Sequence, residues 1–154
     1  MDLMNRYSPD IVYYDDTVLP LFPFCDAGLK LTAHQYNMHP SKDGKGTEGI
    51  VTGKVLKDSH KDAIMWDVER GAPDAIHDEP WQTCTCIGSW HYDKHIYYNN
   101  GYKSAGKVIT MLMDVVSKNG NLLLSVPVRR DGTIDPTEES IVKEIGAWLK
   151  VNSE

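Results

Sequence analysis

The fold class follows from residues 103–127, which have the sequence KSAGKVITMLMDVVSKNGNLLLSVP. In the first part, apolar residues recur at helical spacing, and Asn119-Gly120 is a typical helix end. The second part, NLLLSVP, is a continuous apolar run of the kind found in a parallel sheet that is covered on both faces. A helix that leads directly into such a strand is typical of a parallel α/β fold.

The rest of the chain extends this pattern of helices and strands. Short runs rich in branched and aromatic residues predict strands, and Pro or Gly clusters predict their ends. A long aromatic stretch without clear periodicity predicts an irregular loop, and loops of that length are usually functional. The expected elements before residue 103 are a helix at 2–7, strands at 11–15, 29–36 and 63–69, and the irregular loop at 72–101.

The last helix has the clearest start signal in the chain. Asp135 is a typical N-cap, Pro136 stands at the first helical position, and Glu138 is placed as in a capping box. One apolar stripe follows at helical spacing. It consists of Ile141, Ile145, Trp148 and Leu149.

Composition limits the classes of function. The 154 residues are 41% apolar and 25% charged, which are globular values and predict one domain, 1–154. A net charge of −6 argues against a nucleic-acid partner or an anionic membrane surface. No apolar run is long enough for a membrane-spanning helix, and the first residues lack the apolar core of a signal peptide. As it stands, the chain is expected to stay in the cytoplasm.

Metal binding is not expected. Cys84 and Cys86 are separated by one residue, whereas zinc sites usually have two to four residues between cysteines. The six histidines are scattered, and no His-x-x-x-His pair lies on an expected helix. Buried free thiols are therefore the expected state of this cysteine pair.

The length raises a question about the architecture. A (β/α)8 barrel typically needs about 250 residues, and this chain has 154 and begins with the tail of a helix. Either it forms a small open α/β sheet, or it is the C-terminal half of a distorted (β/α)8, TIM-like barrel. We favour the half-barrel.

Acidic residues follow two of the predicted strands. Asp15 and Asp16 follow one strand, and Asp67 and Glu69 lie at the end of another. Ligands of parallel α/β proteins bind at the carboxyl ends of strands. Two carboxylates about 5–5.5 Å apart perform retaining glycoside hydrolysis, and the aromatic residues Trp81, Trp90 and Tyr92 could stack on sugars. A helix cap, a turn or a surface ion pair would explain the same acids without catalysis.

Four longer segments resemble the second half of the catalytic domain of the family 29 α-L-fucosidases, nearest to Bacteroides-type bacterial members. They are SPDIVYYDD, WDVERGAPDAI, PWQTCTCIGSWHY and DVVSKNGNLLLSVPVRRDGTIDPTEESIVKEIGAWLKVN. The resemblance covers nearly the whole chain. It implies a distorted (β/α)8 barrel and retaining hydrolysis of terminal α-L-fucose.

The resemblance also implies roles for individual residues. The family's nucleophile follows a strand with the pattern seen here from Pro9 onward, which makes Asp15 the nucleophile and leaves Asp16 as a spare acid or cap. Glu69 is the first candidate for the general acid/base, and Glu79 is the second. Arg70 and Trp90 are the expected substrate-binding residues. This chemistry requires no metal and no cofactor.

The implied substrate is a fucosylated oligosaccharide or glycoconjugate, and the implied parent enzyme is exported to the periplasm or outside the cell. A half-barrel would need its missing N-terminal half or self-association to cover its sheet edges. Two alternatives stay open at this point. The chain could be a non-catalytic carbohydrate-binding remnant of such an enzyme, or it could fail to fold on its own.

Overall fold

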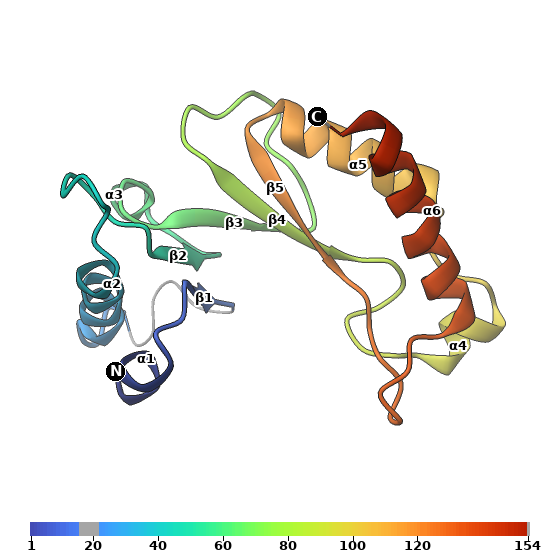
Figure 1. Cartoon of the computed structure of the whole chain (residues 1–154), viewed down its shortest axis with the longest axis horizontal. Helices are drawn as coiled ribbons and strands as arrows, with labels where there is room; N and C mark the ends of the chain where they lie inside the picture. The colour runs from blue at the N-terminus through green and yellow to red at the C-terminus, as the bar shows by residue number, and fades with distance from the viewer. Residues whose placement is uncertain (16–21, 154) are drawn as a thin grey trace. The chain divides into compact units, whose positions relative to one another are not determined.

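The computed structural model describes residues 1–15 and 22–153, so Asp16 lies outside the described part of the chain. The strands form a sheet in the order β1-β2-β3-β4-β5, and β1 with β2 and β2 with β3 pair in parallel. Consecutive strands with helices in the connections confirm the α/β class. The elements are α1 (Asp2–Tyr7), β1 (Ile11–Tyr14), α2 (Ala27–Met38), β2 (Ile50–Gly53), α3 (Asp58–Lys61), β3 (Met65–Glu69), β4 (Trp81–Cys86), α4 (Lys94–Tyr98), α5 (Ala105–Ser117), β5 (Gly120–Ser125) and α6 (Pro136–Asn152) (Figure 1).

The chain divides into two compact units. Unit 1 contains residues 1–68 and 79–82, and unit 2 contains residues 69–78 and 83–154. The core of unit 1 is built around Tyr14, Val51 and Ile64, and the core of unit 2 around Ala105, Val108 and Ile145. The second core joins the apolar faces of α5 and α6, as the helical spacing in both segments predicts. In the described residues, no helix has the length and apolarity needed to cross a bilayer.

Helix α2 replaces the strand that was expected at 29–36. An apolar run suggested a strand, but Leu29 is exposed, whereas Thr32 and Gln35 are buried. The Gln35 amide donates a hydrogen bond of 2.5 Å to the carbonyl of Pro9. The prediction was wrong because this helix buries polar groups that form hydrogen bonds, and an apolar pattern cannot reveal such a face.

Two strands were not predicted. β2 is four residues long, and its register is set by β1, with Val12 opposite Val51. β4 lies inside the stretch expected to be an irregular loop, although all six of its residues are buried. Its Gln, Thr and Cys side chains carry little hydrophobic signal. Their burial depends on neighbouring strands that periodicity cannot anticipate.

The end strands of the sheet are less covered than the sequence suggested. Ile11 on β1 is 56% exposed and Leu123 on β5 is 46% exposed. Along β5, more and less exposed residues alternate over its first four positions, so β5 is not covered equally on both faces. β1 and β5 end the strand order, which explains why their apolar residues are incompletely buried.

The predicted N-cap of α6 is confirmed. Oδ1 of Asp135 accepts hydrogen bonds from the backbone N–H groups of Thr137, at 2.8 Å, and Glu138, at 2.9 Å. The reciprocal half of the capping box does not form in the described structure. Instead the Glu138 side chain is buried, and its Oε2 has no hydrogen-bond partner among the described residues.

Candidate active site

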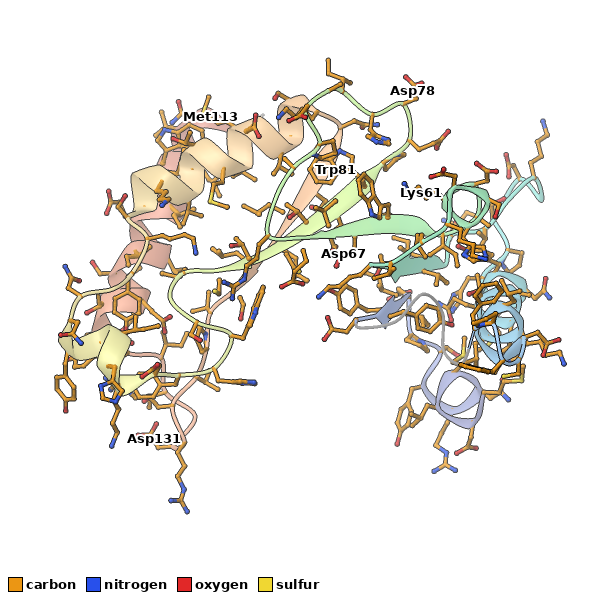
Figure 2. All side chains as sticks on the ribbon, turned by 180° about the vertical axis from the view of Figure 1, so that it is seen from behind. Lys61, Asp67, Asp78, Trp81, Met113 and Asp131 are labelled. Carbon is orange, nitrogen blue, oxygen red and sulfur yellow. The ribbon has the colours of Figure 1, made fainter. Side chains whose placement is uncertain are left out.

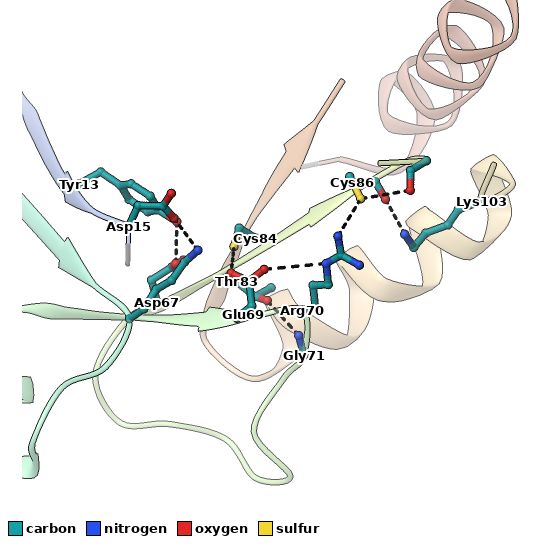
Figure 3. Close-up of polar contacts among 12 residues, drawn as sticks. Tyr13, Asp15, Asp67, Glu69, Arg70, Gly71, Thr83, Cys84, Cys86 and Lys103 are labelled. Atoms are coloured by element: carbon teal, nitrogen blue, oxygen red, sulfur yellow. Dashed lines mark hydrogen bonds and ion pairs between the residues drawn. The ribbon is translucent and has the colours of Figure 1, made fainter. Parts of the chain in front are cut away.

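The predicted nucleophile lies directly after β1 in unit 1. Oδ1 of Asp15 is 2.6 Å from Nζ of Lys54, the first residue after β2 (Figure 3). The Asp15 side chain is 70% exposed, whereas that of Lys54 is only 16% exposed, and its ammonium lies 5.8 Å from the centre of the Tyr13 ring. A largely buried cation thus holds an accessible carboxylate. Sequence reasoning missed Lys54, because β2 was not predicted and a lysine after a strand carries no signal of its own.

A buried carboxylate ties β1 to β3 in the same unit. Asp67 on β3 accepts a hydrogen bond from the Tyr13 hydroxyl at 2.8 Å (Figure 3). It accepts another from the Gln82 amide at 3.0 Å. Asp67, labelled in Figure 2, is 1% exposed. Because both of its oxygens serve donors of the protein, Asp67 is positioned to support the strands rather than to attack a substrate.

The first candidate for the acid/base lies at the start of unit 2. Glu69 is the last residue of β3, and its side chain is about half exposed. Its Oε1 is 3.8 Å from Nε of Arg70, and its Oε2 is 3.4 Å from Sγ of Cys84 on β4 (Figure 3). The carboxylate is therefore accessible on one side and held by a cation and a thiol on the other.

Arg70 brings three of the predicted site residues together. Its φ of 53° lies in the left-handed region, which is rare for a residue with a side chain and is often found at functional sites. The backbone N–H of Arg70 donates to the carbonyl of Cys84 at 3.1 Å, which stabilises this turn. Its guanidinium lies 4.6 Å from the centre of the Trp90 ring. Glu69, Arg70 and Trp90 thus form one cluster.

The second acid/base candidate has a different position. Glu79 is exposed and lies two residues before the start of β4, whereas Glu69 is the last residue of its strand. Active sites of parallel α/β barrels lie at the carboxyl ends of strands, which favours Glu69. The expectation that Trp81 could stack on a sugar is wrong, because its side chain is 1% exposed and belongs to the interior (Figure 2).

A second acidic group, without solvent access, lies at the start of α6. The Tyr102 hydroxyl donates to Oδ2 of Asp135 at 2.5 Å, and burial together with this carboxylate raises the pKa of Tyr102. Burial, and secondarily the charge of Asp135, raises the pKa of Glu138 to about 7, while the cation of Arg129 opposes the shift. Asp135 and Glu138 are buried in unit 2, and Tyr102 is partly buried.

Two carboxylates at strand ends are sufficient for acid/base and nucleophilic chemistry without a metal. Among the described residues, no group of His, Cys, Asp or Glu side chains has the arrangement of a metal site. Cys84 and Cys86 are free and buried, as expected, while Cys25 is exposed.

Comparison with known proteins identifies the family. A family model described as Alpha-L-fucosidase matches residues 1–154. The chain belongs to the α-L-fucosidase family. Among curated relatives it is 29% identical to the tissue α-L-fucosidase of cattle (Bos taurus) and 32% identical to the human plasma α-L-fucosidase. Each alignment covers 99% of this chain and 32% of the relative, so the chain spans about a third of the length of these enzymes.

Solved α-L-fucosidases share the fold. One α-L-fucosidase structure superposes with a TM-score of 0.77 at 29% identity, covering 97% of this chain and 31% of the other. A Thermotoga maritima α-L-fucosynthase in complex with α-L-Fuc-(1-2)-β-L-Fuc-N3 has a TM-score of 0.75 at 27% identity, with 97% and 30% covered. A Bacteroides thetaiotaomicron enzyme, at 19% identity and a TM-score of 0.71, shows likeness of fold alone. The expected fold class, part of a fucosidase barrel, is confirmed.

Proposed function

We propose that the protein containing this chain is a retaining α-L-fucosidase that removes terminal α-L-fucose from glycans, and that residues 1–154 supply both catalytic carboxylates. In this proposal the two compact units belong to one partial catalytic domain, 1–154. The observation that carries the proposal is Asp15, an accessible carboxylate directly after β1 and 2.6 Å from the Lys54 ammonium, in a chain that matches the family model throughout.

The reaction would proceed in two displacements. The Asp15 carboxylate attacks the anomeric carbon of fucose, and the bond from that carbon to the leaving oxygen breaks while Glu69 donates a proton to that oxygen. Glu69, now ionised, then takes a proton from water, and the water oxygen attacks the anomeric carbon. The ester to Asp15 breaks, and fucose leaves with its original anomeric configuration.

Arg70 and Trp90 are proposed to bind the sugar. A guanidinium offers several hydrogen-bond donors to hydroxyl groups, and an aromatic ring packs against the apolar part of a sugar such as its methyl group. The contact between Arg70 and Trp90 would keep both side chains in place beside Glu69. A fucosylated oligosaccharide or glycoconjugate is the substrate class, consistent with the fucosyl ligand named for the Thermotoga neighbour.

Replacement of the nucleophile tests the proposal. In the complete protein that contains this sequence, Asp15→Asn should lower turnover of an aryl α-L-fucoside by at least about a thousandfold, because the neutral amide cannot form the ester. Asp10→Asn, an exposed acid just before β1, is the matched control and should keep wild-type activity. Wild-type turnover by Asp15→Asn would refute the assignment.

The acid/base can be assigned by chemical rescue. Glu69→Ala should lose turnover of substrates with poor leaving groups, and azide should restore activity by attacking the fucosyl ester in place of activated water. Glu79→Ala should behave as the wild type. If azide rescued Glu79→Ala and had no effect on Glu69→Ala, the role would belong to Glu79.

The remaining features of the parent protein are also proposals. We infer that an N-terminal half of the barrel completes the sugar site, since this chain spans about a third of the length of its curated relatives. An exported enzyme of bacterial source is what the resemblance to Bacteroides-type members implies. A complete protein that binds L-fucose but hydrolyses no α-L-fucoside would instead be a non-catalytic carbohydrate-binding relative.

A further inference from the structure

Two cysteines of β4 contact the candidate acid/base cluster of unit 2. Cys84 and Cys86 are separated by one residue on a strand, so both side chains point to the same side of the sheet. Sγ of Cys84 is 3.4 Å from Oε2 of Glu69, and Nη2 of Arg70 is 3.7 Å from Sγ of Cys86 (Figure 3). Each thiol therefore contacts one member of the Glu69–Arg70 pair.

Both thiols are held firmly in the interior. Cys86 is fully buried, and its S–H donates to the carbonyl of Gly88 at 3.4 Å. The ammonium of Lys103 donates to the backbone carbonyl of Cys86 at 2.5 Å. Cys84 is 4% exposed, and its backbone carbonyl accepts from the N–H of Arg70. β4 thus holds the two sulfur atoms in fixed positions beside Glu69 and Arg70.

The two oxygens of the Glu69 carboxylate have different neighbours. Arg70 lies beside Oε1, and Cys84 lies beside Oε2. A carboxylate accepts hydrogen bonds only, so the bond of 3.4 Å requires Cys84 to donate its S–H. This donor orients the carboxylate and favours its ionised form.

A thiol suits this position better than a hydroxyl. An acid/base must both release and regain a proton in each catalytic cycle, so a strong donor at its carboxylate would favour the ionised form too much. The S–H group is a weak donor, and it orients Glu69 with little bias in protonation. A thiol is also small and apolar enough to be buried in β4.

We propose that Cys84 is a positioning residue for the acid/base Glu69, to which it donates, and that Cys86 supports Arg70 as a hydrogen-bond acceptor. The proposal deepens the proposed fucosidase function and rests on it for the role of Glu69. It predicts that the thiol at position 84 sets the orientation of the Glu69 carboxylate and has only a small effect on the pH range in which Glu69 works.

The contact can be tested without any activity, by the S–H stretching band in difference Raman spectra of the protein. The band lost in Cys84→Val should lie at lower frequency than the band lost in Cys25→Val, because Cys25 is an exposed thiol. The Cys84 band should move to higher frequency in Glu69→Ala, which removes the acceptor. An unchanged band in Glu69→Ala would overturn the proposal, whether or not the protein is a fucosidase.

The positioning role is tested by the pH profile of kcat/KM in the complete protein. Cys84→Val, which removes the donor, should lower activity several-fold and move the basic limb upward by roughly half a pH unit. Cys84→Ser, whose hydroxyl is a stronger donor, should keep more activity than Cys84→Val but less than the wild type and move the limb downward, and Cys25→Ser should change neither. A wild-type profile in Cys84→Val would overturn the role. Absence of any fucoside hydrolysis by the wild type would refute the proposed function, and the Raman result would still decide the contact.

Discussion

At the residue scale, the structure adds Lys54 to the site residues that the sequence predicted. Its ammonium contacts the Asp15 carboxylate at 2.6 Å, while its aliphatic stem is mostly buried. Because Asp15 is 70% exposed, water screens this ion pair and its contribution to stability is small, below about 1 kcal/mol. In the proposed reaction its contribution is different, since the cation would orient Asp15, the proposed nucleophile, for attack.

We therefore predict that Lys54→Met separates activity from stability. Methionine keeps the apolar stem, so the free energy of unfolding should change by less than about 1 kcal/mol, while kcat/KM should fall about tenfold. Lys54→Arg should retain most activity. Lys57→Met, which removes an ammonium that lies over the Phe22 ring, is the matched control. Equal activities of Lys54→Met and Lys57→Met would contradict the role of Lys54.

At the element scale, Glu138 at the start of α6 is expected to make the stability of unit 2 depend on pH. Glu138 is buried, its Oε2 lacks a partner in the described structure, and its pKa is raised from an ordinary 4.5 to about 7. Between these values the folded protein holds a proton that the unfolded chain releases. Stability should therefore fall as pH rises from about 4.5 to beyond 7, by up to about 3 kcal/mol.

Glu138→Gln tests this element directly, because glutamine copies the shape of the protonated acid and cannot ionise. At pH 8 the variant should unfold at higher urea concentration than the wild type, and at pH 4 the two midpoints should nearly coincide. Glu144→Gln, exposed on the same helix, should have the wild-type pH dependence. An equal loss of stability with pH in Glu138→Gln would show that another group is responsible.

At the scale of the whole molecule, the strand order leaves an outer edge on β1 and another on β5 in the described part of the chain. Apolar side chains are exposed at both, including Ile11 and Leu123. Exposed strand edges with apolar residues promote pairing with other chains. We therefore expect the 154-residue chain, produced by itself, to self-associate.

Sedimentation can test this expectation. Ile11→Lys places a charge on the edge strand β1 and should reduce the sedimentation coefficient at a given concentration, since charged edges oppose strand pairing. Val55→Lys provides the control, because Val55 is equally exposed but lies in a loop after β2. A wild-type chain that sediments as a compact monomer would contradict the expectation.

Local signals in the sequence predicted those parts of the fold whose structure is set by near neighbours. The N-cap at Asp135, the apolar faces of α5 and α6, and the strand before Asp15 all appear where expected. Helix caps and apolar stripes depend on contacts a few residues apart, so they are visible in the sequence. The positions of Asp15 and Glu69 at the ends of strands were likewise visible in the sequence.

The sequence by itself determined the α/β class, the family resemblance and the candidate carboxylates. Only the tertiary structure decided that 27–38 is helical, that the polar residues of β4 are buried, and that Lys54 and Cys84 contact those carboxylates. The Cys84–Glu69 and Lys54–Asp15 contacts join residues 15 and 39 positions apart along the chain. Such pairs are brought together by strand pairing, and neither composition nor periodicity encodes which distant residues will meet.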